Sequence, residues 1–198
     1  MVKAILEGRK TQTRRVVKPQ PKLINGHDFE WKDLCYSGSS ETGGGTFVLN
    51  CLFGQPGDRL WVRETFIEFP AGSFNFKTEP DPVFEQTKTP WKPSIHMPKT
   101  AARIWLEVEE VKVERLQDIS EEDSYREGIK SDGLMVHCAV CNHGYHNGTD
   151  LICEDGFFYT ARSSFQSLWH SINGVGSWEA NPWVWVVKFK VLSTTGMK

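Results

Sequence analysis

Apolar residues at the start of the chain predict a short helix followed by a strand. Val2, Ile5 and Leu6 recur at helical spacing, and Gly8 can end that helix. Residues 11–17 alternate between two kinds of side chain, which is typical of a strand with one buried face. The first structural unit of the chain is therefore a helix that turns directly into a strand.

Three later segments also have the pattern of strands. Residues 59–69 follow a Gln-Pro-Gly-Asp turn, in which proline and glycine favour the two corner conformations. Residues 103–113 carry Ile104, Leu106 and Val108 on one face, and residues 182–191 have apolar side chains at every second position. In the last segment one face holds Trp183, Trp185, Val187, Phe189 and Val191.

Two further helices are predicted in the second half of the chain. Ser120 can cap a helix whose first turn is acidic, and Gly128 can end it. Apolar residues at helical spacing then predict a second, amphipathic helix. Its buried face contains Phe165, Leu168, Trp169 and Ile172.

The remaining segments are irregular in composition. Residues 22–50 and 129–158 are rich in glycine and polar residues and are interpreted as two insertions, and residues 70–93 as a proline-rich loop. The order of the elements predicts an α+β fold, a small curled β-barrel with short helices at its edges. We expect residues 1–198 to form one domain.

Charge and cysteine content narrow the function classes. The first 22 residues contain seven basic residues and one acidic residue, whereas the rest contains 16 basic and 24 acidic residues. A local basic segment can attract a phosphate or another anion without making the protein a general nucleic-acid binder. We expect no signal peptide and no membrane partner, and the five cysteines favour a reducing compartment, the cytoplasm.

Four motifs in order resemble those of ASCH domains, which belong to the PUA-like group and are frequent in phages. The first is Gly8-Arg9-Lys10-Thr11-Gln12-Thr13-Arg14-Arg15, in which Thr13 replaces the acid of the usual pattern. The others are Pro56-Gly57-Asp58 before a strand, the segment 119–128 ending in Glu-Gly, and the closing Trp-Val-Trp-Val-Val-Lys-Phe strand. The resemblance implies a PUA-like barrel.

A narrower resemblance implies a reaction. The Gly-Arg-Lys-Thr-x-Thr form of the motif is similar to that of small bacterial N4-acetylcytidine amidohydrolases. Carried over to this sequence, their catalytic residues are Lys10, Thr13 and a glutamate matched by Glu127, with Glu121 or Glu122 as the alternatives. The resemblance also implies related functions, because some ASCH proteins are ribonucleases.

Lysine and threonine can together perform acyl transfer. Thr13 can attack an acyl carbonyl if Lys10 takes its proton, which requires burial to lower the pKa of the amine. Alternatively, water held between Lys10 and Glu127 attacks directly. Because residues three apart on a strand face opposite sides, the two side chains converge only if Lys10 precedes the strand. No cofactor is needed for this chemistry.

Several further residues are candidates for binding a substrate. Arg14 and Arg15 suit a phosphate or a base edge, the alternative being an ion pair with an acid such as Glu64. Trp61 and Glu64 lie on the predicted strand 59–69, one face of which must be core. His96 could contact a base, although a lone histidine is more often structural.

A cysteine and histidine cluster in the second insertion suggests a structural zinc site. Cys138 and Cys141 have the first spacing of such sites, and Cys153 with His143 or His146 would complete four ligands. The alternative is an insertion with incidental thiols. With four protein ligands, such a site would stabilise the insertion and take no part in catalysis.

Two function classes follow from the sequence. The first is an amidohydrolase that acts on a nucleoside or modified base, and the second is a PUA-like reader of RNA or modified nucleic acid. Abundant tryptophans and the basic first segment favour the reader, whereas Lys10 and Thr13 favour the enzyme. A reader's affinity should fall steeply with salt concentration.

Overall fold

A four-stranded antiparallel sheet forms the centre of the molecule. The computed structural model describes residues 1–24, 28–32, 34–37, 51–70, 72–80, 89–131 and 160–196. The strand order is β1-β9-β8-β5. These strands are β1 (Gln12–Val16), β5 (Arg59–Trp61), β8 (Trp105–Arg115) and β9 (Trp183–Ser193). The first strand of the described chain therefore lies beside the last.

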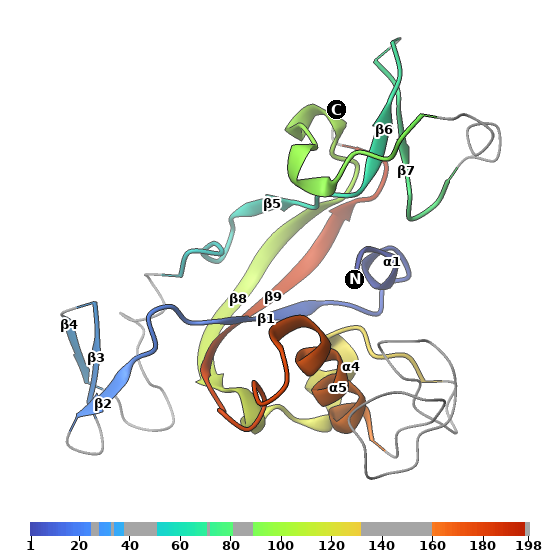
Figure 1. The fold of residues 1–198 in the computed structure, drawn as a ribbon. Coiled ribbons are helices and arrows are strands. Elements are labelled where there is room, and N and C mark those ends of the chain that lie inside the picture. Colours follow the sequence, from blue (N-terminus) through green and yellow to red (C-terminus); the bar gives the residue numbers. More distant parts are fainter. Residues whose placement is uncertain are drawn as a thin grey trace.

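The sheet is strongly curled into a half-barrel. β8 and β9 form a long antiparallel pair, and β1 runs along the outer side of β9 (Figure 1). The register between β8 and β9 shifts twice, at Trp105/Leu106 and at Val108/Glu110. Such bulges bend strands and increase their twist. The curled sheet agrees with the small barrel that the sequence predicts.

Two helices cover one face of the sheet. They are α4 (Glu121–Arg126) and α5 (Ala161–Asn173), and they lie side by side below the strands in Figure 1. Val184 and Val186 of β9 pack against Phe165 and Trp169 of α5. None of the helices in the described ranges has the length and apolar character required to cross a membrane.

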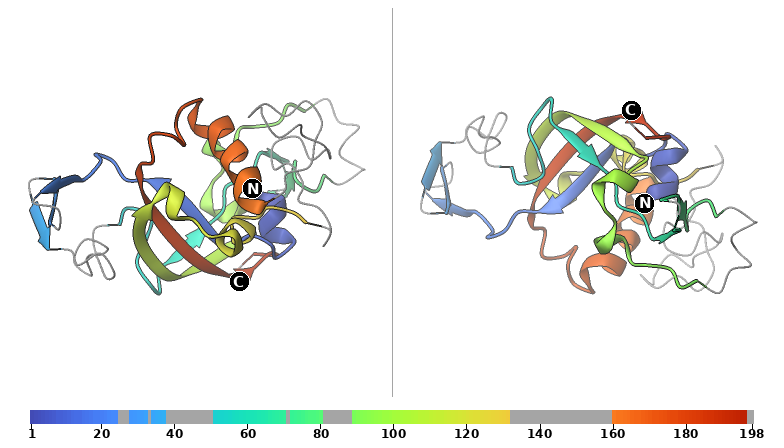
Figure 2. Two further views of the ribbon diagram at one scale, coloured as in Figure 1. Left: turned by 90° about the horizontal axis from the view of Figure 1, so that it is seen from below. Right: turned by 90° about the horizontal axis from the view of Figure 1, so that it is seen from above.

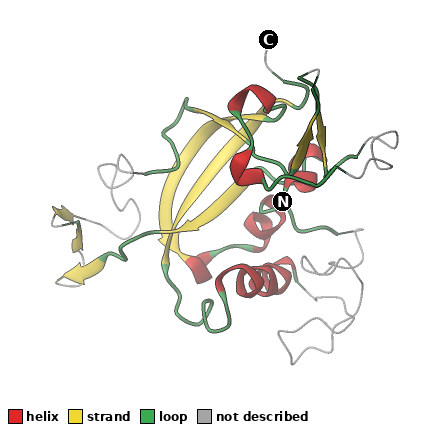
Figure 3. Cartoon of the chain, turned by 45° about the horizontal axis from the view of Figure 1, so that its top comes forward, coloured by secondary structure: helices red, strands yellow, loops and turns green. Residues whose placement is uncertain are grey.

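The opposite, concave face carries the residues of the same strands that lie between those facing the helices, such as Trp185 and Val187 of β9. Val187 and Trp185 belong to one buried cluster there, and Phe189 packs with Leu106 in another. The short helix α1 (Val2–Leu6) closes one end of the half-barrel, because Ile5 is buried in the second cluster. Helices therefore lie on one side and at one end of the sheet (Figure 3).

Smaller elements extend this core. A three-stranded sheet of β2 (Lys22–Ile24), β3 (Asp28–Trp31) and β4 (Leu34–Ser37) stands apart from the half-barrel (Figure 2). A hairpin of β6 (Phe66–Glu68) and β7 (Phe74–Phe76) follows β5, and single helical turns span Ser94–His96, Lys99–Ala101 and Leu116–Asp118. The indole of Trp31 meets that of Trp185 edge-on, with centroids 5.9 Å apart.

The structure corrects the prediction of one strand over residues 59–69. β5 ends at Trp61, and after residues 62–65 the chain pairs β6 with β7 instead of β8. The apolar pattern continues through both strands, although they belong to different sheets. The insertion over residues 22–50 contains β2, β3 and β4, whereas all but the first three residues of the 129–158 insertion lie outside the described residues.

Candidate active site

A buried ion pair joins the turn before β1 to the end of α4. Nζ of Lys10 donates hydrogen bonds to Oε2 of Glu127 at 2.7 Å and to its carbonyl oxygen at 2.8 Å. Both residues are about 95% buried, and their backbones form an isolated β-bridge. The structure thus brings together two of the three residues, Lys10 and Glu127, that the sequence singled out as candidates for catalysis.

Local structure explains why Glu127 meets Lys10. Ser120 caps α4 by accepting a hydrogen bond from the backbone of Asp123, and the helix ends at Glu127. Gly128 then adopts a φ of 100°, and a Cβ there would lie 2.9 Å from that of Ala4. Glycine therefore permits the close approach of this turn to α1 and Lys10.

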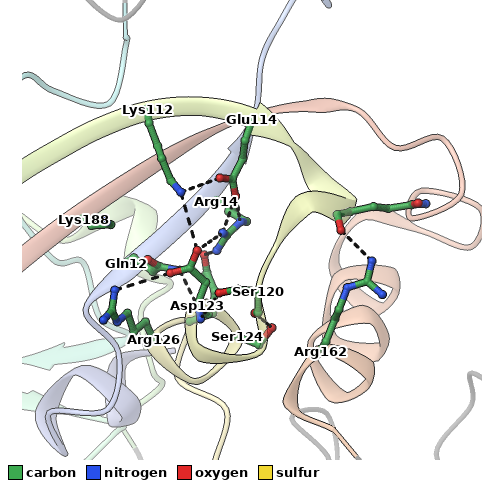
Figure 4. Close-up of polar contacts among 12 residues, drawn as sticks. Gln12, Arg14, Lys112, Glu114, Ser120, Asp123, Ser124, Arg126, Arg162 and Lys188 are labelled. Carbon is green, nitrogen blue, oxygen red and sulfur yellow. Dashed lines mark hydrogen bonds and ion pairs between the residues drawn. The ribbon is translucent and has the colours of Figure 1, made fainter. Parts of the chain in front are cut away.

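Arg14 holds the second oxygen of Glu127. Its guanidinium donates to Oε1 of Glu127 at 3.1 Å. It also donates to Glu114 at 2.5 Å and to Asp123 at 3.1 Å (Figure 4). The Arg14 side chain is fully buried on the helix-covered face of the sheet. The sequence left two roles open for Arg14, contact with a ligand or an ion pair with an acid, and the structure shows the ion pair, with Glu127 among its partners.

A pocket opens on the concave side of the half-barrel. Its volume is about 660 Å³, within the usual range for small-molecule sites. Lys10 and Thr13 both line it, since Lys10 precedes β1 and Thr13 lies on the strand, as the prediction required. The floor is apolar, formed by Ile5, Leu60, Val62, Leu106, Val187 and Phe189.

Three arginines and a tryptophan also line this pocket. The structure places the predicted residues Arg15 and Trp61 there, and also Arg63, which the sequence considered with Trp61 on the predicted strand 59–69. It adds Arg59, which the sequence did not single out. The guanidinium of Arg63 lies over the Trp61 ring, 4.9 Å from its centroid. Arg59, Trp61 and Arg63 occupy every second position of the segment 59–63, which places them on one side of an extended chain. This alternation, combined with the curl of the sheet, is the sequence signal that points both arginines toward the pocket.

Glu64 and His96 lie outside this pocket. Glu64 is buried, and both its oxygens accept hydrogen bonds at 2.9 Å from Arg103, so it is a structural ion-pair residue. Arg103 was not predicted as its partner; the sequence had considered Arg14 or Arg15. His96 is exposed in a single helical turn.

The alternative glutamates are occupied elsewhere. Glu121 accepts hydrogen bonds from the first backbone amides of α5, and Glu122 pairs with Arg126 within α4. Neither lies against Lys10, so Glu127 is the glutamate that the fold brings to this lysine.

Burial changes the acid–base behaviour of Lys10. Desolvation lowers the pKa of its ammonium group below the ordinary value of 10.5, and the carboxylate of Glu127 partly opposes this shift. An amine of lowered pKa can accept a proton more readily near neutral pH. Lys10, which lines the pocket with Thr13, is therefore suited to take a proton from a hydroxyl group or water bound there.

The predicted zinc ligands are not part of this site. Cys138, Cys141, His143, His146 and Cys153 all lie outside the described residues. Within the ranges that the structure describes, no group of three or more histidine, cysteine or acidic residues is arranged to hold a metal ion. The zinc hypothesis stays a prediction.

Comparisons with protein-family models, curated proteins and solved structures gave no match.

Proposed function

We propose that this protein hydrolyses the amide bond between an acyl group and the exocyclic N4 of a cytidine-type nucleoside. The observation that supports it best is that Lys10, whose ammonium group pairs with Glu127, lines the same pocket as Thr13. The Gly-Arg-Lys-Thr-x-Thr motif gives the substrate class by resemblance. The half-barrel with helices on one face is also consistent with an ASCH or PUA-like fold.

In the first step, Oγ of Thr13 attacks the acyl carbon while its proton passes to Nζ of Lys10. The tetrahedral intermediate then collapses, the C–N bond breaks, and Lys10 returns the proton to the departing N4 amine. This leaves an acyl ester on Thr13, which water hydrolyses with Lys10 again as the base. Direct attack by water is the alternative, with the same proton transfers.

Glu127 is assigned an orienting role in this mechanism. Its two carboxylate oxygens are engaged by Lys10 and Arg14, and it does not line the pocket. A carboxylate held in this way is better suited to position the lysine than to donate a proton to the leaving amine. Lys10 is then the group that carries the proton.

The test is hydrolysis of N4-acetylcytidine, followed by ultraviolet absorbance. We expect release of cytidine by the wild type and a loss of about 10²-fold or more in Lys10→Met, the range for removal of a general base. Lys190→Met is the matched control, because Lys190 is exposed and lies outside the pocket. A folded wild-type protein without activity would contradict the proposal.

A second measurement distinguishes the two nucleophiles. If Thr13 attacks, acid quenching during turnover should yield protein heavier by one acetyl group, with the label on the peptide that contains Thr13. Thr13→Ala should lose both the label and the activity. An active Thr13→Ala enzyme would assign the attack to water.

A reader of modified nucleic acid is the second candidate function. It is favoured by Trp61 and the three arginines in the pocket, because aromatic rings and guanidinium groups stack on bases. This function predicts binding of RNA that contains N4-acetylcytidine with neither deacetylation nor cleavage. Incubating this RNA with the purified protein distinguishes a reader from a ribonuclease, because a ribonuclease would shorten the RNA.

A further inference from the structure

The arginines of the pocket differ from most others in the described part of the chain. Arg9, Arg14, Arg103 and Arg126 each pair with at least one carboxylate. Arg15, Arg59 and Arg63, in contrast, have no ion pair with any residue in the described ranges. Three uncompensated guanidinium groups thus converge on one pocket.

The remaining charges of the pocket do not neutralise them. The charge of Lys10 is already matched by Glu127, and Asp58 is the one acidic residue among the described residues that line the pocket. Oδ2 of Asp58 accepts a hydrogen bond from the backbone of Gln55, which keeps this carboxylate in the turn before β5. The pocket therefore has an excess of positive charge.

The arginines come from both edges of the curled sheet. Arg15 lies on β1, two residues beyond Thr13 and on the same side of the strand, while Arg59 begins β5 at the other edge. Residues two apart on a strand are separated by about 6.6 Å. A ligand whose acyl group reaches Thr13 would thus present its other end to cationic groups, and guanidinium groups bind phosphate in a bidentate manner.

We infer that the substrate of this pocket is a phosphorylated nucleoside, a nucleotide with an acylated base, and that Arg15, Arg59 and Arg63 bind its phosphate. The inference rests on the proposed function and further specifies that the substrate carries a negatively charged phosphate group. The phosphate belongs either to a free nucleotide or to an oligonucleotide, and the experiment includes both.

The first experiment compares kcat/KM for N4-acetylcytidine, its 5′-monophosphate and a short oligonucleotide with one such base. We expect a phosphorylated substrate to be preferred by about tenfold or more, the value of one or two charge-assisted hydrogen bonds. Arg15→Gln, Arg59→Gln and Arg63→Gln should each reduce this ratio. The better of the two phosphorylated substrates identifies the source of the phosphate.

The matched control is Arg162→Gln. The guanidinium of Arg162 on α5 also lacks a carboxylate partner among the described residues, and it lies over the Trp178 ring as that of Arg63 lies over Trp61. It is outside the pocket, so the preference for phosphate should stay as in the wild type. Equal kcat/KM for the nucleoside and both phosphorylated substrates would overturn the inference and leave the proposed amidohydrolase intact.

A binding measurement separates the two proposals if no substrate is hydrolysed. Titration calorimetry with cytidine and cytidine 5′-monophosphate needs no turnover. Tighter binding of the monophosphate by about tenfold, weakened in the three arginine variants but not in Arg162→Gln, would support the phosphate site while the hydrolase fails. Equal affinities for both ligands, or binding of neither, would overturn the phosphate site.

Discussion

At the scale of single residues, the ammonium group of Lys10 has exchanged water for two oxygen atoms of Glu127. Burial lowers the pKa of Lys10 from 10.5, so its neutral form becomes available at lower pH than in an exposed lysine. If this amine is the base, kcat should rise with pH and reach a plateau below pH 10.5. A pH–rate profile measures this, and a rate that falls over the same range would contradict it.

The same pKa shift has a consequence for stability. The unfolded chain binds the Lys10 proton more tightly than the folded protein does. Between the folded pKa and 10.5, the contribution of this group to the free energy of unfolding therefore rises with pH. Denaturant unfolding of the wild type and of Lys10→Met over this range isolates the contribution.

Arg14 is a positioning residue whose planar fork matters as much as its charge. Arg14→Lys keeps the charge but cannot hold Glu114, Asp123 and Glu127 together. We expect kcat to fall by about 10²-fold through misplacement of the Glu127–Lys10 pair. KM should change little, because Arg14 does not line the pocket.

Lys112→Met is the control for this substitution. Lys112 pairs with Glu114 at the exposed side of the same network and does not touch Glu127. A purely structural role for Arg14 would lower the stability of Arg14→Lys without changing kcat of the folded fraction.

The residues of the site differ in how far the sequence could predict them. Lys10 and Thr13 could be predicted because they lie three positions apart in one local motif. Glu127 was predicted from the resemblance of this motif to that of the amidohydrolases. The partners of Arg14 lie about a hundred residues away in the chain, so only the folded sheet brings them together. Arg59 and Arg63 likewise join the pocket through the curl of the sheet.

At the scale of elements, the turn after α4 sets the position of Glu127. Gly128→Ala would place a methyl group 2.9 Å from Cβ of Ala4 and 3.2 Å from Cβ of Lys10, at a φ of 100°. We expect a loss of about 1–2 kcal/mol from the backbone strain alone, and a lower kcat because Lys10 must shift. Chemical denaturation and the hydrolysis assay measure the two effects.

Ser120→Ala is the comparison at the other end of α4. It removes the cap on Asp123 and should cost about 1 kcal/mol of stability while the turn at Glu127 remains. Equal kcat in Gly128→Ala and Ser120→Ala would contradict a special role for the turn.

The elements themselves were predicted well where a local signal fixes them. The cap at Ser120 and the periodicity through Phe165 and Trp169 identified α4 and α5. The division of residues 59–69 into β5 and β6 was missed, because it depends on pairing with β7 and on the ion pair of Glu64 with Arg103. Residues 22–50, interpreted from the sequence as an inserted loop or irregular hairpin, contain β2 to β4, and these individual strands were not predicted because the segment carries little periodic signal.

At the scale of the whole molecule, the small sheet β2–β4 is joined to the half-barrel through Trp31. Its ring is buried against Trp185, and its Nε1 donates a hydrogen bond to the carbonyl of Pro19 at 2.7 Å. Trp31→Ala should reduce the free energy of unfolding by about 3–5 kcal/mol. Thermal unfolding monitors the loss, and an unchanged midpoint would show that the small sheet contributes little to the core.

The pairing of β1 with β9 has a consequence for how the protein is made. Thr13 on β1 lies opposite Val187 on β9. β1 therefore cannot pair with its neighbour in the central sheet until β9 has left the ribosome. Closing such a distant contact is slow compared with the local pairing of a hairpin. A nascent or truncated chain that lacks β9 would contain the pocket residues of β1, Thr13 and Arg15, but it could not form the pocket. Activity should therefore appear abruptly, and only after β9 has been synthesised.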